Sequence, residues 1–334
     1  MFKKRLAIVG ATGAVGRVFL ELLEEKYPGP KDLFLLASKR SAGKKIKCGF
    51  QDFVIEDLDN FDFSQADIAF FSAGSEIAGK YAPLAVSKGC TVIDNSSRFR
   101  GDDDKALIVP EVNAHVLKDI EFPAIIANPN CSTAQLLVAL KPVHDLFTIK
   151  RIDVATYQSV SGSGKIGIDE LTMQTKDFLD KNKVSVNVYD AQIAFNVIPA
   201  GDRLDNNYTN EEMKMTWETN KILDQDIQLT ATCTRVPVYF GHSEAVHIET
   251  KKLIDLDKLI NAMKLQSGLD VYPSDDLSAP NAVDQAEGKN PVSIGRIRKD
   301  LWSDYRINFW VVADNLRKGA ALNSLQILDE LINI

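Results

Sequence analysis

Cys131 is the residue of this chain best placed to do chemistry. An apolar run at 122–127 predicts a short strand, Asn-Pro-Asn at 128–130 predicts a tight turn, and the apolar run at 132–140 predicts a helix. Cys131 therefore falls in the first turn of a helix, where unpaired N–H groups and the helix dipole favour negative charge. A thiolate should form there more easily than in free cysteine. The alternative is a buried cysteine that packs as a small apolar side chain.

A reactive cysteine needs an acid or base nearby, and the chain has four histidines. His242 follows a glycine at an expected bend between two strands, which predicts an accessible ring. His144 falls on the helix after Cys131 and His247 falls inside a strand, so packing roles are expected for both. His242 is the candidate acid or base, although sequence alone does not place it near Cys131.

A glycine-rich turn near the N-terminus predicts a dinucleotide site. Gly10, Gly13 and Gly16 follow an apolar run and open a helical pattern. Glycines permit a tight turn and let the backbone approach a pyrophosphate, whose charge then lies at the helix N-terminus. The spacing is GxxGxxG and not GxGxxG, so an ordinary strand-to-helix turn of an unrelated α/β protein remains the alternative.

The end of the second expected strand bears on the choice of cofactor. A domain that binds NAD usually has an acidic residue there for the ribose 2′-hydroxyl. Residues 38–44 instead read Ser-Lys-Arg-Ser-Ala-Gly-Lys, with several cations and no acid. NADP is the expected cofactor because these cations can bind a 2′-phosphate, and a basic surface loop is the alternative. A thiolate beside a nicotinamide suggests chemistry through a thioester, in which hydride passes between the cofactor and a covalent intermediate.

Two different patterns of elements must position these residues. In the first half, strands expected at 6–9, 33–37, 68–72, 91–94 and 124–127 alternate with helices at 15–25 and 76–87, which predicts a Rossmann-type, doubly wound α/β domain with a parallel sheet. The second half has strands expected at 151–159, 228–238, 243–252, 292–298 and 305–313. These predict an α+β domain with a largely antiparallel sheet.

Composition excludes several classes of protein. The chain has 334 residues and a net charge of −7, which argues against nucleic-acid binding as its main role. The four cysteines lie far apart and form no CxxC pair, so neither a disulfide framework nor a metal site is expected. No apolar run is long enough for a signal peptide or a membrane span, so we expect a cytoplasmic enzyme.

Five motifs, in order along the chain, resemble the aspartate-semialdehyde dehydrogenase family: Gly10-Ala-Thr-Gly-Ala-Val-Gly16, Asp94-Asn-Ser-Ser-Arg98, Asn128-Pro-Asn-Cys-Ser-Thr133, Gln158-Ser-Val-Ser-Gly-Ser-Gly164, and Arg235-Val-Pro-Val followed by Gly241-His242-Ser243. The resemblance runs from the first strand to the last helix. It implies an NADP-binding domain at 1–128, completed by a C-terminal helix at 315–334, and a catalytic and dimerisation domain at 129–314. A homodimer is implied by the resemblance alone.

The resemblance also implies a role for each matching residue. Cys131 matches the nucleophile, His242 the acid/base and Gln158 the residue that orients the acyl intermediate. The substrate-binding residues implied are Arg98 and Lys214 for phosphate, Arg235 for the substrate carboxylate, Glu211 for its ammonium, and Asn130. The cofactor-binding residues implied are Gly10, Thr12, Gly13, Ala14, Val15, Ser38, Arg40, Ser41, Ala73, Gly74, Ser161, Gly162, Gly164 and Asn315.

The implied reaction is the NADPH-dependent conversion of L-4-aspartyl phosphate to L-aspartate 4-semialdehyde and phosphate. It belongs to the biosynthesis of lysine, threonine, methionine and diaminopimelate. Two alternatives stay open. An N-acetyl-glutamyl-phosphate reductase would share the cysteine and cofactor chemistry, although its acylated amine carries no ammonium for Glu211 to bind. A dinucleotide-sensing protein without activity would have no use for Cys131, Gln158 and His242 together.

Overall fold

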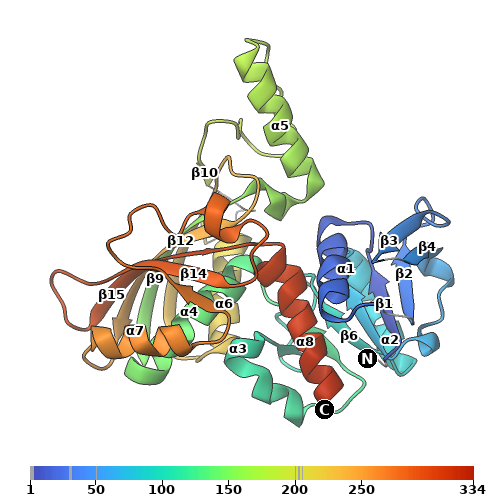
Figure 1. Ribbon diagram of the computed structural model, residues 1–334, viewed down its shortest axis with the longest axis horizontal. Coiled ribbons are helices and arrows are strands. Elements are labelled where there is room, and N and C mark those ends of the chain that lie inside the picture. Colours follow the sequence, from blue (N-terminus) through green and yellow to red (C-terminus); the bar gives the residue numbers. More distant parts are fainter. Residues whose placement is uncertain (1–3, 30–31, 50, 200, 202–203, 205) are drawn as a thin grey trace. The chain divides into compact units, whose positions relative to one another are not determined.

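The chain forms two compact units in a computed structural model that describes residues 4–29, 32–49, 51–199, 201, 204 and 206–334. Unit 1 comprises Met1–Pro129 and Ala320–Ile334, and unit 2 comprises Asn130–Gly319. Each unit has its own sheet (Figure 1). No helix in the described part of the chain is long and apolar enough to cross a membrane.

Unit 1 is built on an eight-stranded sheet with the order β3-β4-β2-β1-β5-β6-β8-β7. Every neighbouring pair is parallel except the antiparallel pair β3 and β4. This confirms the predicted α/β domain with a parallel sheet. The strands are β1 (Leu6–Val9), β2 (Leu33–Ala37), β3 (Lys45–Cys48), β4 (Gln51–Asp57), β5 (Ile68–Phe71), β6 (Thr91–Asp94), β7 (Ala106–Leu107) and β8 (Ile125–Ala127).

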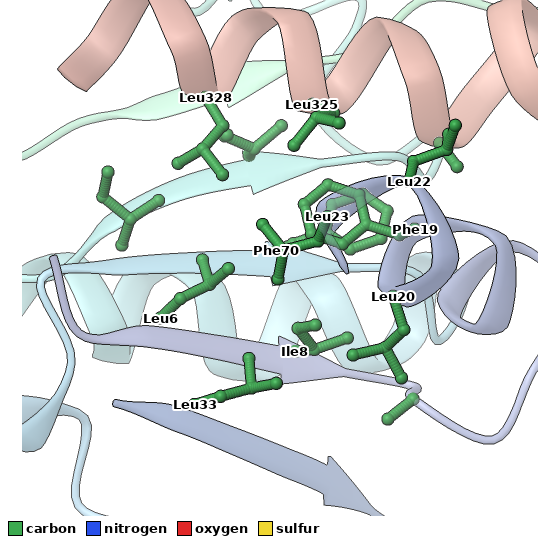
Figure 2. Packing of buried hydrophobic residues seen from close by; sticks show 14 of the residues in the cluster. Leu6, Ile8, Phe19, Leu20, Leu22, Leu23, Leu33, Phe70, Leu325 and Leu328 are labelled. Atoms are coloured by element: carbon green, nitrogen blue, oxygen red, sulfur yellow. The ribbon is translucent and has the colours of Figure 1, made fainter. Parts of the chain in front are cut away.

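The helices of unit 1 bury the apolar residues of this sheet. They are α1 (Ala14–Lys26), α2 (Ser75–Ser87), α3 (Pro110–Asn113) and α8 (Leu322–Asn333). Figure 2 shows Phe19 of α1 stacked on Phe70 of β5, with Leu325 and Leu328 of α8 in the same cluster. The last helix of the chain therefore packs in the core of unit 1, although the residues before it belong to unit 2.

Two features of the secondary structure differ from expectation. The hairpin of β3 and β4 was not predicted, because both strands lie at one edge of the sheet and only alternate residues such as Ile46 and Phe53 are buried. The predicted C-terminal helix starts too early. A π-helical turn at Arg317–Ala321 precedes α8, and the Asp314 carboxylate accepts the N–H groups of Leu316 and Arg317, so a regular helix forms only from Leu322.

Unit 2 has a seven-stranded sheet with the order β10-β11-β9-β12-β15-β14-β13. It is antiparallel except at the pairs β9–β11 and β13–β14, which confirms the predicted largely antiparallel sheet. Its strands are β9 (Ile149–Gln158), β10 (Ile198–Pro199), β11 (Gln228–Arg235), β12 (His242–Thr250), β13 (Leu269–Val271), β14 (Val292–Lys299) and β15 (Arg306–Ala313).

The α-helices of unit 2 are α4 (Cys131–Phe147), α5 (Lys165–Leu179), α6 (Asn210–Ile222) and α7 (Leu256–Leu265). Helix α4 contacts β9, β12, β14 and β15 together with α6 and α7, and most of its residues are buried. Helix α5 extends away from the sheet of its own unit (Figure 1). The central position of α4 fixes its first residue, Cys131, against the strands that carry the other candidate residues.

Candidate active site

Cys131 is the first residue of α4, where the sequence predicts it. Asn130 is the N-cap, and its Oδ1 accepts the backbone N–H groups of Ser132 at 3.0 Å and Thr133 at 3.4 Å. This cap satisfies two of the donors that a helix start leaves unpaired. Cys131 remains partly exposed and is not in a disulfide. The positive end of the helix dipole therefore lies beside a thiol that reagents can reach.

A network of hydrogen bonds holds the residues around Cys131. Asn130 donates its side-chain N–H to Glu211 Oε1 at 2.7 Å and its backbone N–H to Glu218 Oε2 at 2.6 Å. Gln158 Nε2 donates to Ser132 Oγ at 3.0 Å and lies 3.3 Å from Glu211 Oε1. Asn130, Gln158 and Glu211 were expected in the site from the sequence, and one network in unit 2 joins them on both sides of the cysteine.

Helix α6 contributes one face to this network. Lys214 Nζ lies 3.4 Å from Glu211 Oε2, so the pair shares a helix face as its spacing predicts. Glu218 lies on the same side of the helix and is 2% exposed. The sequence reasoning missed Glu218, although the spacing of Glu211, Lys214 and Glu218 at i, i+3 and i+7 was a signal that all three share one face.

His242 begins β12 and is fully buried, with 0% exposure, so the predicted accessible ring is wrong. The ring turns inward because Nδ1 accepts the backbone N–H of Ser159 at 3.1 Å. An accepting Nδ1 assigns the proton of the neutral ring to Nε2. Burial, and then the charge of Arg235, lower the pKa of His242 to about 3. Nε2 has no hydrogen-bond partner among the described residues, so an N–H donor is available in the site.

Arg235 converges on the same point as His242. Its Nη1 donates to the backbone oxygen of Ser159 at 2.7 Å, and its Nε is buried without a partner in the described part of the chain. A Cβ atom placed on Gly162 would lie 2.7 Å from Arg235 Nη1 and 3.4 Å from His242 Nε2. The loop at 161–164 therefore runs directly against both side chains, and it can do so because position 162 has no side chain.

Asn315 joins three segments of this site. Its Oδ1 accepts from Ser159 Oγ at 3.0 Å, from Ser161 Oγ at 3.1 Å and from the backbone N–H of Gly241 at 3.0 Å. Asn315 is 3% exposed and lies before the π-helical turn, outside α8. The side-chain oxygen of Asn315 thus holds Gly241, which precedes His242, together with Ser159 and Ser161, which follow β9. Gly164 takes φ +75° at the start of α5 and ends the loop.

Six of the ten cofactor residues expected in the N-terminal half line a cavity of about 510 Å³ within unit 1. Gly10 has φ +89°, and a Cβ there would lie 2.8 Å from the backbone oxygen of Ser72, so the turn requires glycine. Ala14 and Val15 form the first turn of α1, which follows this turn directly. The expected residues that line the cavity are Gly10, Thr12, Gly13, Ser38, Arg40 and Ala73.

Two other expected cofactor residues shape the backbone near this cavity without lining it. Ser41 donates its N–H to the oxygen of Ser38 at 2.8 Å, which closes the basic loop into a turn. Gly74 takes φ +90° and caps α2. The glycine turn, the helix start and the cations Lys39 and Arg40 together form a cradle of the kind that binds a dinucleotide.

Asp57 and Asp59 also line this cavity and were missed from the sequence. Asp57 is the last residue of β4, and Asp59 lies two residues after it. The register places Asp57 beside Ala37 at the end of β2. Asp59 accepts a hydrogen bond from the hydroxyl of Tyr81, and Lys80 lies 3.5 Å away. The Tyr81 hydrogen bond, followed by the charge of Lys80, lowers the pKa of Asp59. The alternation of apolar residues along 51–57 was the available signal.

Arg98 belongs to unit 1, whereas the other expected substrate-binding residues belong to unit 2. It follows β6 in the segment Asp94-Asn-Ser-Ser-Arg98, where Asp94 accepts from the backbone N–H and hydroxyl of Ser96. Its Nη1 lies 3.7 Å from Asp102, and its guanidinium lies over the ring of Phe99. Unit 2 thus gathers Cys131, Asn130, Gln158, Glu211, Lys214, Arg235, His242, Ser161, Gly162 and Asn315, and unit 1 holds Arg98 with the glycine turn and the basic loop.

Comparisons with known proteins match both parts of the chain to models of known protein families. Residues 5–120 match the family model described as the semialdehyde dehydrogenase NAD binding domain, and residues 140–318 match the semialdehyde dehydrogenase dimerisation domain. The N-terminal unit is therefore an NAD(P)-binding domain, as its glycine turn predicts.

Individual relatives match over nearly the whole chain. An aspartate-semialdehyde dehydrogenase of Shewanella violacea is 49% identical over 329 residues, which cover 98% of this chain and 97% of the relative. The crystal structure of aspartate semialdehyde dehydrogenase II from Vibrio cholerae complexed with ASA has a TM-score of 0.97 at 48% identity and covers 100% of this chain and 99% of that one. The structure of the Candida albicans enzyme with NADP has a TM-score of 0.75 at 25% identity and covers 99% of both chains. With both family models and full-length relatives in agreement, the chain belongs to the aspartate-semialdehyde dehydrogenase family.

Proposed function

We propose that this enzyme converts L-4-aspartyl phosphate to L-aspartate 4-semialdehyde through a thioester on Cys131, with NADPH as reductant. The main structural support is the convergence in unit 2 of a thiol at a helix start, a buried Nε2–H donor on His242 and the guanidinium of Arg235. A nucleophile, an oxyanion donor and a carboxylate ligand are the groups that acyl transfer to and from an α-amino acid requires.

In the proposed first step, the Cys131 thiolate attacks the acyl carbon of aspartyl phosphate. The new C–S bond replaces the C–O bond to phosphate, and phosphate leaves with the electron pair. In the next step the thioester carbon gains a hydride and becomes a tetrahedral thiohemiacetal. The C–S bond then breaks, the aldehyde is released and sulfur leaves as the thiolate. The helix start at Cys131 stabilises the thiolate both before the first step and after the last.

In this mechanism His242 acts as the donor to the reacting oxygen. Its Nε2–H donates to the carbonyl oxygen and then to the oxyanion of the thiohemiacetal, in line with the acid role that the sequence implies. A ring with a pKa lowered to about 3 stays neutral at physiological pH, so it places no positive charge beside the guanidinium of Arg235. Preorganised donors of this kind are worth most in a site that excludes water.

The remaining residues hold the two ends of the substrate. Arg235 binds the α-carboxylate, which suits a planar guanidinium, and Glu211 binds the ammonium. Arg98 and Lys214 bind the phosphate. Gln158 and Asn130 orient the acyl group, and their hydrogen bonds to Ser132 and Glu211 keep them beside the cysteine. Lys214 also pairs with Glu211 on the same helix face.

For the cofactor we propose NADP in preference to NAD. The cofactor supplies the hydride that reduces the thioester. Lys39 and Arg40 line the cavity of unit 1 and suit a 2′-phosphate, and the turn at Gly10 suits the pyrophosphate. The NADP-bound Candida albicans relative supports this preference. The loop at 161–164 and Asn315 complete the cofactor set, and Ala14, Val15, Ser41 and Gly74 shape it through the backbone.

We further propose that the active form is a homodimer in the cytoplasm. Support comes from the family model of the C-terminal part, which is that of a dimerisation domain. It also comes from large apolar side chains exposed on α5 and the segment after it: Ile166, Met173, Phe178, Leu179, Phe195 and Val197. Light scattering on wild type and Phe178→Glu tests this: a dimer that becomes a monomer in the variant is expected, and a wild-type monomer would contradict it.

Phosphate-dependent reduction of NADP by aspartate semialdehyde tests the proposed function. Wild type is expected to be active, Cys131→Ala inactive, and His242→Asn reduced by two to four orders of magnitude, as for loss of an oxyanion donor or acid. Cys90→Ala is the matched control, because that cysteine is buried in unit 1 and burial raises the pKa of its thiol. Full activity in Cys131→Ala would refute the proposed thioester intermediate on this cysteine.

A further inference from the structure

The strand that carries His242 also carries a buried carboxyl group that forms no ion pair with any residue the structure describes. Glu244 lies two residues further along β12 and is 0% exposed. Neither of its oxygens has a hydrogen-bond partner among the described residues. The register places Thr156 of β9 opposite Glu244, and Thr156 Oγ1 is also buried with no hydrogen-bond partner in the described ranges. Burying an ionised carboxylate without a partner costs much free energy, and a proton on Glu244 removes the charge and with it most of that cost.

Gln135 of α4 lies beside this carboxyl group, outside the geometry of a hydrogen bond, and it lowers the pKa of Glu244 by less than burial raises it. Its Nε2 donates to the backbone oxygen of His242 at 3.3 Å, and its Oε1 is buried with no partner in the described part of the chain. The amide therefore turns its donor to His242 and keeps an unsatisfied acceptor. A protonated Glu244 supplies the missing donor, and one O–H···O bond then satisfies both groups.

Gln135 connects the two halves of the proposed catalytic pair. It lies four residues after Cys131, so the two side chains share a face of α4. Its bond to the His242 oxygen joins that helix to the first residue of β12. A fixed Gln135 amide thus holds the strand of the histidine against the helix of the cysteine.

The titratable groups nearest to Glu244 do not provide a counter-charge. On its own strand, burial keeps His242 neutral. On β11, burial raises the pKa of the Cys233 thiol, and Glu211, Glu212 and Glu244 raise it further. Gln135 from α4 and Thr156 from β9 are uncharged. Burial accordingly raises the pKa of Glu244 well above its ordinary value.

We propose that Glu244 is protonated in the folded enzyme and acts as a positioning residue for His242. Its O–H donates to Gln135 Oε1, and this fixes the Gln135 amide so that Nε2 holds the backbone oxygen of His242. The link to catalysis rests on the role proposed above for His242. The protonation itself does not depend on that role, so it is tested by a measurement that needs no turnover.

Kinetics test the positioning role. Glu244→Gln keeps a donor of nearly the same shape, whereas Glu244→Met fills the space without one. Loss of one neutral hydrogen bond corresponds to about a tenfold effect. We expect Glu244→Met to lower kcat about tenfold with little change in KM, and Glu244→Gln to recover most of that loss with an unchanged pH profile of kcat. Equal losses in the two variants, or full activity in Glu244→Met, would overturn the role.

Stability measured against pH tests the protonation, even if Glu244→Met does not fold. The folded carboxyl has a raised pKa, so the unfolded chain releases its proton first and wild type loses stability as pH rises above about 4.5. Relative to wild type, the folding constant of Glu244→Gln is expected to increase by up to about tenfold per pH unit from there toward pH 7.

Glu249→Gln, the same substitution on the same strand, is the matched control for this measurement. The Glu249 carboxylate pairs with Lys150 and Arg306, which lower its pKa. Its paired charge stabilises wild type fully above the ordinary glutamate pKa and this stabilisation is lost only below it, so from about pH 4.5 to 7 this variant should differ from wild type by a constant amount. A difference between Glu244→Gln and wild type that stays constant over this pH range, as expected for Glu249→Gln, would show an ionised Glu244 and overturn the proposal.

Discussion

An added methyl group at position 162 tests whether the loop at 161–164 positions Arg235 and His242. A Cβ on Gly162 would lie 2.7 Å from Arg235 Nη1, closer than such contacts allow, and 3.3 Å from His242 Cε1. The backbone itself does not oppose alanine, because Gly162 is not among the residues with positive φ. The guanidinium must therefore move, and it is held by the bond of Nη1 to the Ser159 oxygen at 2.7 Å.

The size of the effect follows from that bond. A hydrogen bond from a charged group contributes about 1.5–3 kcal/mol, so a displaced Arg235 should lower kcat/KM for aspartate semialdehyde by roughly 10- to 150-fold. The assay is initial-rate kinetics with NADP and phosphate, accompanied by thermal unfolding and by titration of NADP binding. Ser163→Ala in the same turn is the control and should be close to wild type.

NADP binding separates two possible roles of Gly162, because the sequence places this residue in the cofactor set. If the methyl group acts through Arg235, the loss in kcat/KM for the semialdehyde exceeds any change in NADP affinity. Wild-type kinetics in a folded Gly162→Ala, or a loss confined to NADP affinity, would refute the reasoning from the Arg235 contact.

Three further predictions concern other parts of the site. Because the pKa of His242 is about 3 when folded, against 6.5 for an ordinary histidine, the unfolded chain binds one more proton between these values. Wild type should therefore lose up to about 1.4 kcal/mol of unfolding free energy per unit as pH falls below 6.5, and His242→Asn should show a shallower loss in denaturant titrations; parallel curves would contradict this. Asn130→Ala removes the cap of α4 and should cost about 1–2 kcal/mol and most of the activity; a stability equal to wild type would argue against the cap. Arg40→Ala should raise KM for NADP about tenfold or more and leave KM for NAD unchanged, whereas equal effects on both cofactors would show that Arg40 does not bind the 2′-phosphate.

Local patterns were sufficient to predict much of the fold. The corner at Cys131 combines an apolar strand, a turn with proline and an apolar helix, and each of these signals lies within a few residues of the cysteine. The glycine turn at Gly10 is equally local, and its close approach to Ser72 O explains why glycine is required. The hairpin of β3 and β4 was not predicted because its strands bury only alternate residues and lack the continuous apolar runs of the other strands.

Contacts between distant residues account for what the sequence could not predict. The Glu218 carboxylate accepts the backbone N–H of Asn130, which lies 88 residues away in the sequence. The backbone N–H of Ser159 donates to His242 Nδ1, 83 residues away. The burial of His242 follows from the packing of α4 on β12, which a glycine before the histidine does not reveal. Glu244 was missed for the same reason, because an acidic residue in an alternating strand is normally expected to face solvent.

Trapping the covalent intermediate tests the central claim most directly. Wild-type enzyme is mixed with aspartate semialdehyde and NADP without phosphate, quenched in acid, digested and analysed by mass spectrometry. The mechanism predicts an aspartyl thioester on the peptide that contains Cys131, formed together with reduced cofactor and released when phosphate is added before the quench. Reduced cofactor without an adduct on that peptide, or an adduct on another residue that phosphate releases at the same rate, would contradict it.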